Sequence, residues 1–297
     1  MSSARRSGGQ VLLIVLLGVT GALFMVLSIA SRSVNDLSQT SLSQSSSQAF
    51  SAAEAGIENA LLGGVGIGVT VGNSTYTNSN VALSAATKAF NYPVPLSSGE
   101  MAYLWLVNRD GSGNFVIDGE SFRSTTLDLC WGNVGVTDPN IPAIEFEMYY
   151  DTTTDYVDGT PPTFVNVGVK RTAYDPVSTR SNNFVKTGIV TDCVIDKVTY
   201  AYGTEININT LGIANPCPEN QGCLMLATAK ILYSSQKQPV GFRSDNTANE
   251  AEFPSQGVAI ESIGTADGST RKVQLVQTFE NPESIFTNGI YAGGNVN

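Results

Sequence analysis

The chain has 297 residues, enough for one large domain or two smaller domains with proper cores. Its 26 acidic and 16 basic residues give a formal net charge of −10, so we expect no nucleic-acid partner, because phosphate contacts need lysine and arginine. Histidine is absent, which excludes a Ser–His–Asp triad, a Cys–His pair and a histidine-ligated zinc site.

An uncharged apolar run of 20 residues, from Val11 to Ala30, follows a short segment that contains Arg5 and Arg6. As an α-helix rising about 1.5 Å per residue, such a run crosses about 30 Å of hydrocarbon. Basic residues stay on the cytoplasmic side of a membrane. The run therefore predicts a single-pass protein of the cytoplasmic (inner) membrane, with its N-terminus in the cytoplasm and the rest of the chain outside.

Two other fates of the run are open on these residues alone. A secretory signal peptide would be cut after Ala30, because Ser28 and Ala30 are small. The run is, however, longer than the roughly 7–15 apolar residues usual in a signal peptide. A plain signal anchor is the other alternative, and it requires no particular sequence on either side of the run.

The helical pattern does not stop where the apolar run ends. Residues 32–62 contain no proline and a single glycine, Gly56. Apolar residues recur there at loosely helical spacing, namely Val34, Leu37, Leu42, Ala49, Ala53, Ile57 and Ala60. We therefore expect one continuous helix from about Gln10 to Leu62, about 80 Å long, whose second part is amphipathic and lies outside the membrane.

The order of these features carries a family resemblance. A short basic leader ends in glycine ("RRSGGQ"), the apolar helix starts at once, a Ser/Gln-rich amphipathic stretch follows, and then comes "AFSAAEAGIENAL". Over about Arg5 to Leu62 the chain resembles type IV pilin-like proteins, and most of all PilX-type minor pilins. The resemblance implies that a prepilin peptidase cuts after Gly9 and leaves Gln10 as the mature N-terminus. It also implies that the helix packs against other pilin or pseudopilin subunits, in a pilus or a type II secretion system.

Two positions depart from the pattern of major pilins. Gln10 stands where phenylalanine or methionine is usual, and Ile14 stands where the family usually has a glutamate. In the family that glutamate is thought to pair with the free amino terminus of a neighbouring subunit. Its absence is consistent with a minor or tip subunit, which need not make the same contact.

From Gly63 onward the sequence changes to β-type and turn residues. Alternating apolar and polar residues predict strands in "MAYLWLV", "AIEFEMYY", "FVNVGVKR", "VIDKVTYA" and "CLMLATAKILY". We therefore expect an α+β protein with a leader (residues 1–9), a long helix (10–62, membrane-spanning over 11–30) and one mainly antiparallel, β-rich extracytoplasmic head (63–297).

Two of these strand predictions specify more than the strand itself. In Ala143–Tyr150 the alternation places Ile144, Phe146 and Met148 on one face, and Glu145 and Glu147 on an opposite, exposed face. Near the C-terminus, Asp267 and Gly268 separate two alternating runs. This pair is typical of a two-residue hairpin turn, so Gly257–Phe279 is expected to form a β-hairpin.

Four cysteines, an even number beyond an apolar segment, favour an oxidising compartment. Cys217 and Cys223 enclose the turn-rich loop "PENQG", which a disulfide would close. Cys130 would then pair with Cys193, although two other pairings are possible. Neither a zinc motif nor a calcium loop matches the spacing of cysteines and carboxylates, including the acidic stretch "DTTTDYVDG", so we expect no metal and no cofactor.

No constellation of catalytic residues is recognisable. Aromatics such as Trp105, Trp131 and Tyr149 could form an exposed sugar- or surface-binding patch, but we expect them to pack in the core. The sequence thus favours a non-enzymatic structural subunit, a minor type IV pilin or pseudopilin-like protein, whose head is displayed at a filament tip or surface for adhesion or assembly. The alternative is a signal-anchored surface adhesin or binding module that enters no filament. A secreted hydrolase released after Ala30 is the third interpretation.

Overall fold

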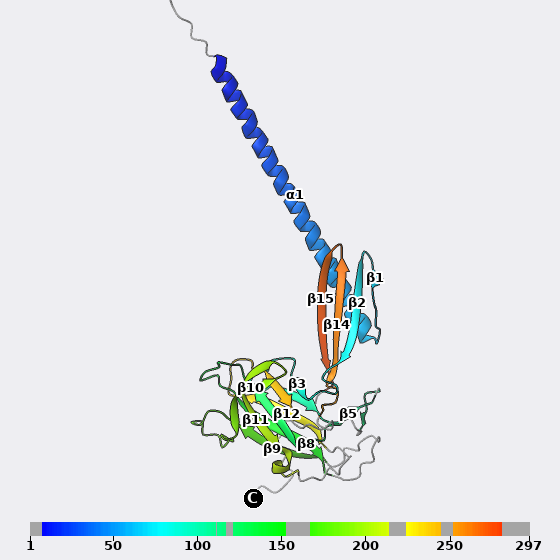
Figure 1. Cartoon of the computed structure of the whole chain (residues 1–297), viewed down its shortest axis with the longest axis vertical. Coiled ribbons are helices and arrows are strands. Elements are labelled where there is room, and N and C mark those ends of the chain that lie inside the picture. The colour runs from blue at the N-terminus through cyan, green and yellow to red at the C-terminus, as the bar shows by residue number, and fades with distance from the viewer. Residues whose placement is uncertain are drawn as a thin grey trace, which may run out of the picture. The chain divides into compact units, whose positions relative to one another are not determined.

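The computed structural model describes residues 8–110, 112–116, 121–152, 167–213, 224–244 and 252–280. Its contacts divide the chain into two compact units, Met1–Asn80 with Ile260–Leu275 and Val81–Ala259 with Val276–Asn297. The first unit holds a long helix and a four-stranded sheet, and the second holds the remaining strands (Figure 1). The expected fold class, a long N-terminal helix followed by a mainly antiparallel β-rich part, is confirmed.

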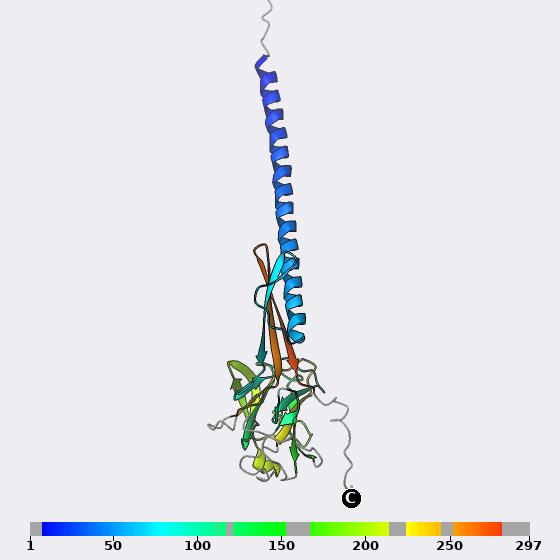
Figure 2. The same ribbon diagram turned by 90° about the vertical axis from the view of Figure 1, so that its right-hand side faces the viewer.

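Helix α1 runs without a break from Gly8 to Leu61, 54 residues that span about 81 Å. Figure 2 shows its course from a second direction. The helix ends because Gly63 adopts a positive φ of 83°, and the amide of Gly64 then donates to the carbonyl of Asn59 at 2.9 Å. This is the glycine-dependent C-terminal cap common in helices. The continuous helix predicted from Gln10 to Leu62 is confirmed.

The sheet of the first unit has the strand order β1-β2-β14-β15. Its strands are β1 (Val69–Val71), β2 (Ser74–Ala82), β14 (Gly257–Ala266) and β15 (Ser269–Thr278). The hairpin predicted near the C-terminus is confirmed as β14 and β15, with Asp267 and Gly268 at φ values of 43° and 80°. Residues 63–297, expected to form a single head, therefore contribute to both units, because the first and last strands of that range join α1.

Small residues let the second half of α1 lie directly on this sheet. Ala49 and Ala53 are fully buried and Ala60 nearly so. A side chain added at Gly264 of β14 would clash with the carbonyl oxygen of Ala49, and one added at Gly56 of α1 would clash with the hydroxyl of Ser262. The backbones of helix and sheet are thus too close to admit even a methyl group at Gly264, and at Gly56 the side chains of Ser262 and Tyr76 already occupy the space.

A buried amide fastens the end of α1 to the first strands. The Nδ2 of Asn78, on β2, donates to the carbonyl of Gly56 at 2.7 Å. The amide of Gly66, in the loop after the helix, donates to the Oδ1 of Asn78. Because Asn78 is almost fully buried, both hydrogen bonds are shielded from water and hold helix, loop and strand together.

The second unit contains two larger sheets and a short one, with strand orders β10-β11-β7-β13-β3, β4-β12-β8-β9 and β5-β6. The first comprises β10 (Ile189–Ile195), β11 (Val198–Asn207), β7 (Thr126–Trp131), β13 (Val240–Arg243) and β3 (Ala89–Asn91). The others comprise β4 (Met101–Trp105), β12 (Leu224–Leu232), β8 (Ala143–Asp151), β9 (Val167–Tyr174), β5 (Asn108–Arg109) and β6 (Phe115–Val116). Large side chains from both larger sheets, such as Trp131, Phe242 and Phe146, share one core.

The strands predicted in "MAYLWLV", "AIEFEMYY" and "CLMLATAKILY" are confirmed as β4, β8 and β12, and the described part of "FVNVGVKR" is β9. One expectation is wrong: Val194–Ala201 is not a single strand, because Asp196 and Lys197 both take positive φ values, 43° and 70°, and turn the chain from β10 into β11. Neither residue is a glycine or asparagine, which is why the turn escaped prediction.

The expected exposed face of β8 is also wrong at one position. Glu145 is partly exposed, but Glu147 is only 2% exposed. Its carboxylate forms an ion pair with Arg171 of the neighbouring strand β9 and accepts a hydrogen bond from Tyr149 at 2.8 Å. A buried carboxylate is tolerated where such partners replace water.

Cys130 on β7 and Cys193 on β10 form a disulfide, as predicted, with a Cα–Cα distance of 5.9 Å. The bond passes over β11, the strand between them, at Gly203, where an added Cβ would meet Cys193. Cys217 and Cys223 lie outside the described residues, and their pairing stays a prediction.

Replacing both Cys130 and Cys193 by alanine should destabilise the second unit by about 4 kcal/mol, because the bond closes a loop of 63 residues in the unfolded chain. Urea unfolding followed by tryptophan fluorescence measures this, since both tryptophans belong to the second unit. Reduction of the unmodified protein should lower the midpoint at least as far as the double variant does, because reduction also opens the predicted bond between Cys217 and Cys223. Equal stability of the variant and the oxidised protein would show that the disulfide is dispensable.

Replacing Gly264 by valine should loosen α1 from its sheet by about 3 kcal/mol, because the new side chain enters space that the helix backbone occupies. Hydrogen exchange of residues 45–60 is the readout. The control is Thr270→Val on the same hairpin, which places the same valine side chain at an exposed position. Unchanged exchange in Gly264→Val would contradict the close packing.

Candidate assembly surface

The first candidate residues for processing, Gly9 and Gln10, lie in the first turn of α1, which begins at Gly8. Arg5 and Arg6 lie outside the described residues. Gly9 and Gln10 are thus continuous with the apolar helix.

The apolar segment of α1 is exposed along its whole described length. Between Leu12 and Ile29 its large apolar side chains are 55–74% exposed. By length and composition this helix can cross a membrane. Gly18 and Gly21 have no neighbouring atom within 4 Å that a Cβ would meet, so no packing within the described chain requires glycine there.

The stretch that carries the family resemblance divides into two faces. Gly56 and four of its five alanines are buried against the sheet of the first unit, and only Ala55 is partly exposed. Phe50 is 46% exposed, and Glu54 and Glu58 are exposed on the other side of the helix. The small residues of the motif therefore serve packing within the chain, whereas its phenylalanine and glutamates remain available for contacts with another molecule.

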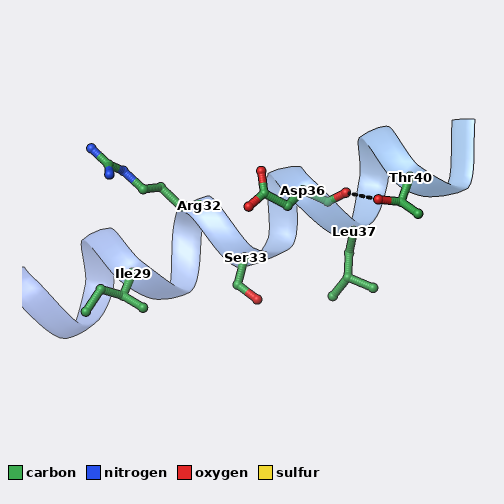
Figure 3. Close-up of a pocket in the computed structure, with 6 residues that line it drawn as sticks. All are labelled: Ile29, Arg32, Ser33, Asp36, Leu37 and Thr40. Carbon is green, nitrogen blue, oxygen red and sulfur yellow. Dashed lines mark hydrogen bonds between the residues drawn. The ribbon is translucent and has the colours of Figure 1, made fainter. Parts of the chain in front are cut away.

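Figure 3 shows a shallow hollow on α1, in which the hydroxyl of Thr40 donates to the backbone carbonyl of Asp36 at 2.8 Å. It is lined by Ile29, Arg32, Ser33, Asp36, Leu37 and Thr40. Because a single helix supplies every lining residue, the hollow is a surface groove rather than an enclosed pocket. A second hollow follows along α1 from Gln39 to Ser47. Neither groove encloses enough of a small ligand to form a binding pocket of the usual kind.

Within the described ranges, no group of three or more histidine, cysteine, aspartate or glutamate side chains could hold a metal ion. The acidic stretch considered for calcium lies outside those ranges from residue 153 onward. Of the aromatics considered for a binding patch, Trp131 is fully buried and Trp105 is 8% exposed, so core packing is confirmed for both. Tyr149 is half-buried and bonded to Glu147.

A cluster of charged side chains in the second unit was missed from the sequence. The carboxylate of Asp175 is fully buried and accepts hydrogen bonds from the Lys186 ammonium at 3.0 Å, Arg180 at 3.1 Å, Asn182 at 2.7 Å and the Val177 amide at 2.9 Å. All of these residues come from one segment of twelve, "DPVSTRSNNFVK", whose mixed charges are the only sequence signal. The cluster satisfies its own members, so its role is to fold this segment.

The same contacts set the ionisation of Asp175. Burial by itself would raise the pKa of this carboxyl group, but the Val177 amide, the Lys186 ammonium, the Asn182 amide and the Arg180 guanidinium together hold the pKa below its ordinary value of 3.8. Asp175 is therefore charged near neutral pH, where it stabilises the fold.

No family model, curated protein or solved structure matches the chain. Within the described residues, the long exposed helix is the largest uncovered apolar surface. Its apolar half has no cover within the described chain, and its second half presents a phenylalanine and carboxylates to the outside.

Because the pKa of Asp175 is lower in the folded state, its stabilisation is fully present above the ordinary value of 3.8 and is lost as the pH falls through the lower, folded value. The second unit should thus weaken on acidification below about pH 4. Asp175→Asn should cost about 3 kcal/mol at pH 7, because it leaves two cations without their buried counter-charge, and should flatten this part of the pH dependence. Tryptophan-monitored urea unfolding from pH 7 to pH 2 tests both effects.

The matched control is Asp267→Asn in the exposed hairpin turn, where asparagine suits the same backbone conformation. This variant should leave unchanged both the free energy of unfolding at pH 7 and its decrease at acidic pH. If Asp175→Asn behaves like this control, the buried cluster does not stabilise the unit.

Proposed function

We propose that the chain is a structural subunit of a type IV pilus or of a pseudopilin-like assembly, as its N-terminal resemblance suggests. In this proposal α1 first holds the subunit in the cytoplasmic membrane and then packs among the helices of other subunits. The chain performs no catalysis. Its β-rich part is displayed outside the cytoplasm, at the tip or surface of the assembly, for adhesion or for assembly itself.

One observation carries the proposal: a single unbroken helix has an uncovered apolar half and a second half with a folded sheet docked on it. A plain membrane anchor needs neither the continuity nor the docking, since any flexible linker would tether a head. A rigid helix that fixes the position of its sheet is useful where many subunits must be stacked with one geometry. This supports an assembly protein over a tethered binding module.

Further features fit the same proposal. The disulfide between Cys130 and Cys193 suits an oxidising, extracytoplasmic compartment. Arg5 and Arg6 suit a cytoplasmic N-terminus. Ile14, in place of the family's glutamate, suits a minor subunit that does not make the usual contact with a neighbour's amino terminus. The partners are then a prepilin peptidase, other pilin-like subunits and the membrane.

The proposal predicts a mature chain that begins at Gln10, because the peptidase cuts after Gly9. Gly9→Leu should abolish this cleavage and keep the subunit out of sheared filaments, whereas Gly8→Leu, the same change one residue earlier, should leave cleavage largely intact. Mass spectrometry of the protein from its native envelope measures the N-terminus in each variant.

Other termini would identify other functions. A chain that begins at Ser31 would be a secreted domain whose apolar run is discarded. A chain that keeps residues 1–9, with Gly9→Leu unchanged, would be a signal-anchored surface protein, and the adhesin interpretation would replace the proposal.

A further inference from the structure

The segment between β9 and β10 brings a lysine, an asparagine and a buried aspartate into mutual contact. Oδ2 of Asp175, whose side chain is fully buried, accepts a hydrogen bond from Nζ of Lys186 at 3.0 Å and another from Nδ2 of Asn182 at 2.7 Å. Nζ of Lys186 also donates to Oδ1 of Asn182 at 2.8 Å, so the third side of this triangle is closed. An amine, an amide and a carboxylate therefore meet around one oxygen atom.

The fold of the segment holds these three groups in place. The amide of Asp175 donates to the carbonyl of Val185 at 3.0 Å, and the amide of Val185 donates to the carbonyl of Ala173 at 2.8 Å. The other carboxylate oxygen of Asp175, Oδ1, accepts hydrogen bonds from the Val177 amide and from Arg180. The orientation of the carboxylate is thus fixed, and its Oδ2 is left for the amine and the amide.

The contacts match the parts that an acyl transfer needs. Nζ of Lys186 is a nucleophile bonded to a carboxylate that can take its proton. Cγ of Asn182 is an electrophile, and its leaving nitrogen, Nδ2, is bonded to the same carboxylate oxygen. Oδ1 of Asn182 also accepts from the amide of Phe184 at 3.2 Å, a donor for the negative charge that gathers on this oxygen during attack. A salt bridge alone would need neither the amide nor this donor.

We propose that Lys186 and Asn182 join spontaneously in an intramolecular amide (isopeptide) bond, with Asp175 as the catalytic residue that carries the protons. Once Nζ of Lys186 has given a proton to Oδ2 of Asp175, its lone pair forms a bond to Cγ of Asn182, and the bond from Cγ to Nδ2 breaks. Two of the three protons of the lysine ammonium pass by way of Oδ2 to Nδ2, which leaves as ammonium. Asp175 ends as the carboxylate that it was at the start, and the step needs no other reactant.

The ionisation of Asp175 sets the pace of this step. Its pKa lies below the ordinary value because the hydrogen bonds and cations around it outweigh its burial, so the carboxylate is charged and can accept a proton. The same low pKa makes it a weak base. We therefore expect the bond to form slowly and once in each folded chain, over days rather than seconds.

The bond would brace the segment that follows β9. Asn182 and Lys186 are four residues apart, and Asn183 between them turns the chain with a positive φ of 56°. Their side chains would close a small ring within the second unit. Unlike the disulfide of the same unit, an amide bond survives reduction. This inference goes beyond the proposed function and does not rest on it.

The test is peptide mass spectrometry of the full-length folded chain, both freshly purified and after several days of storage. Trypsin cannot cut after a lysine whose Nζ is an amide. The expected product is therefore an uncut peptide of residues 181–197, lighter by about 17 Da, the mass of the lost ammonia. Its fragmentation should give no backbone ions that separate residue 182 from residue 186, because the ring holds both sides together. These ions decide the question in the unchanged chain, whatever the variants do.

Variants assign the roles of the residues. Lys186→Arg keeps the positive charge beside Asp175 but replaces the amine by a poor nucleophile, so its peptides should keep their full mass. Lys197→Arg, the same change at an exposed turn, is the control and should still lose ammonia. Asp175→Asn removes the base and should keep the full mass as well. Tryptophan fluorescence confirms that each variant is folded.

Three results would overturn the inference. Normal cutting after Lys186 with full peptide mass, even after storage, would show that the contacts form a salt bridge and nothing more. A light peptide that is still cut after Lys186, or a loss of ammonia that persists in Lys186→Arg, would show that Asn182 has closed a ring with its own backbone instead. A bond that forms in folded Asp175→Asn would remove the catalytic role given to Asp175.

Discussion

The apolar surface of α1 must be covered, and this constraint governs the rest of the molecule. Between Leu12 and Ile29, thirteen large apolar side chains are more than half exposed. At about 1.5–3 kcal/mol for each buried side chain, their transfer out of water is worth roughly 20–40 kcal/mol. That exceeds the roughly 5–15 kcal/mol by which a typical domain is stable. By length and composition the helix can cross a membrane, and in the function that we propose a lipid bilayer and then a bundle of like helices cover these side chains.

The second half of α1 must stay helical although it is rich in serine. A serine-rich segment has a poor intrinsic tendency to form a helix, because its hydroxyl groups compete for backbone hydrogen bonds. Two supports compensate: the apolar helix before it supplies the nucleus for propagation, and the sheet after it binds Ala49, Ala53 and Gly56 at backbone distance. Because these residues have small side chains or none, the helix lies close to the sheet. Asn78 adds buried hydrogen bonds that fix the end of the helix.

Local patterns were sufficient for part of this structure. The helix from Gly8 to Leu61, the turn at Asp267 and Gly268, and the strands of alternating residues follow from propensity and periodicity. Alternation tells which residues share a face but not which face is covered by the rest of the protein. Glu147 is buried with Arg171 of β9 as its partner, and β9 is joined to β8 by a long connection, so no local pattern could predict this burial. The division into two units could not be predicted from local patterns either, because the first unit joins segments that are far apart in the sequence. The hydrogen bond between Thr75 and Thr265, for example, joins residues 190 apart.

The sequence predicted only part of the candidate surface, for a related reason. The sequence indicated an apolar run and a resemblance-bearing motif, and both belong to α1. It did not reveal that the alanines of the motif face inward while Phe50 and Glu54 face outward, since that distinction exists only once a sheet has covered one side. The clustering of Asp175, Arg180 and Lys186 likewise depends on a turn that no short pattern specifies.

Because β14 and β15 come late in the chain, the sheet that covers α1 is complete only after almost the whole chain has been made. The small-residue face of α1 is made early in synthesis, but β14 and β15, which cover it, come after the whole second unit. Until Ile260–Leu275 has been made and folded, Ala49, Ala53 and Gly56 lack the sheet that buries them. A chain truncated before these strands would keep a long helix whose small-residue face is uncovered. In the assembly that we propose, only a completely exported subunit presents Phe50 and Glu54 on a helix whose other side is already covered by its sheet.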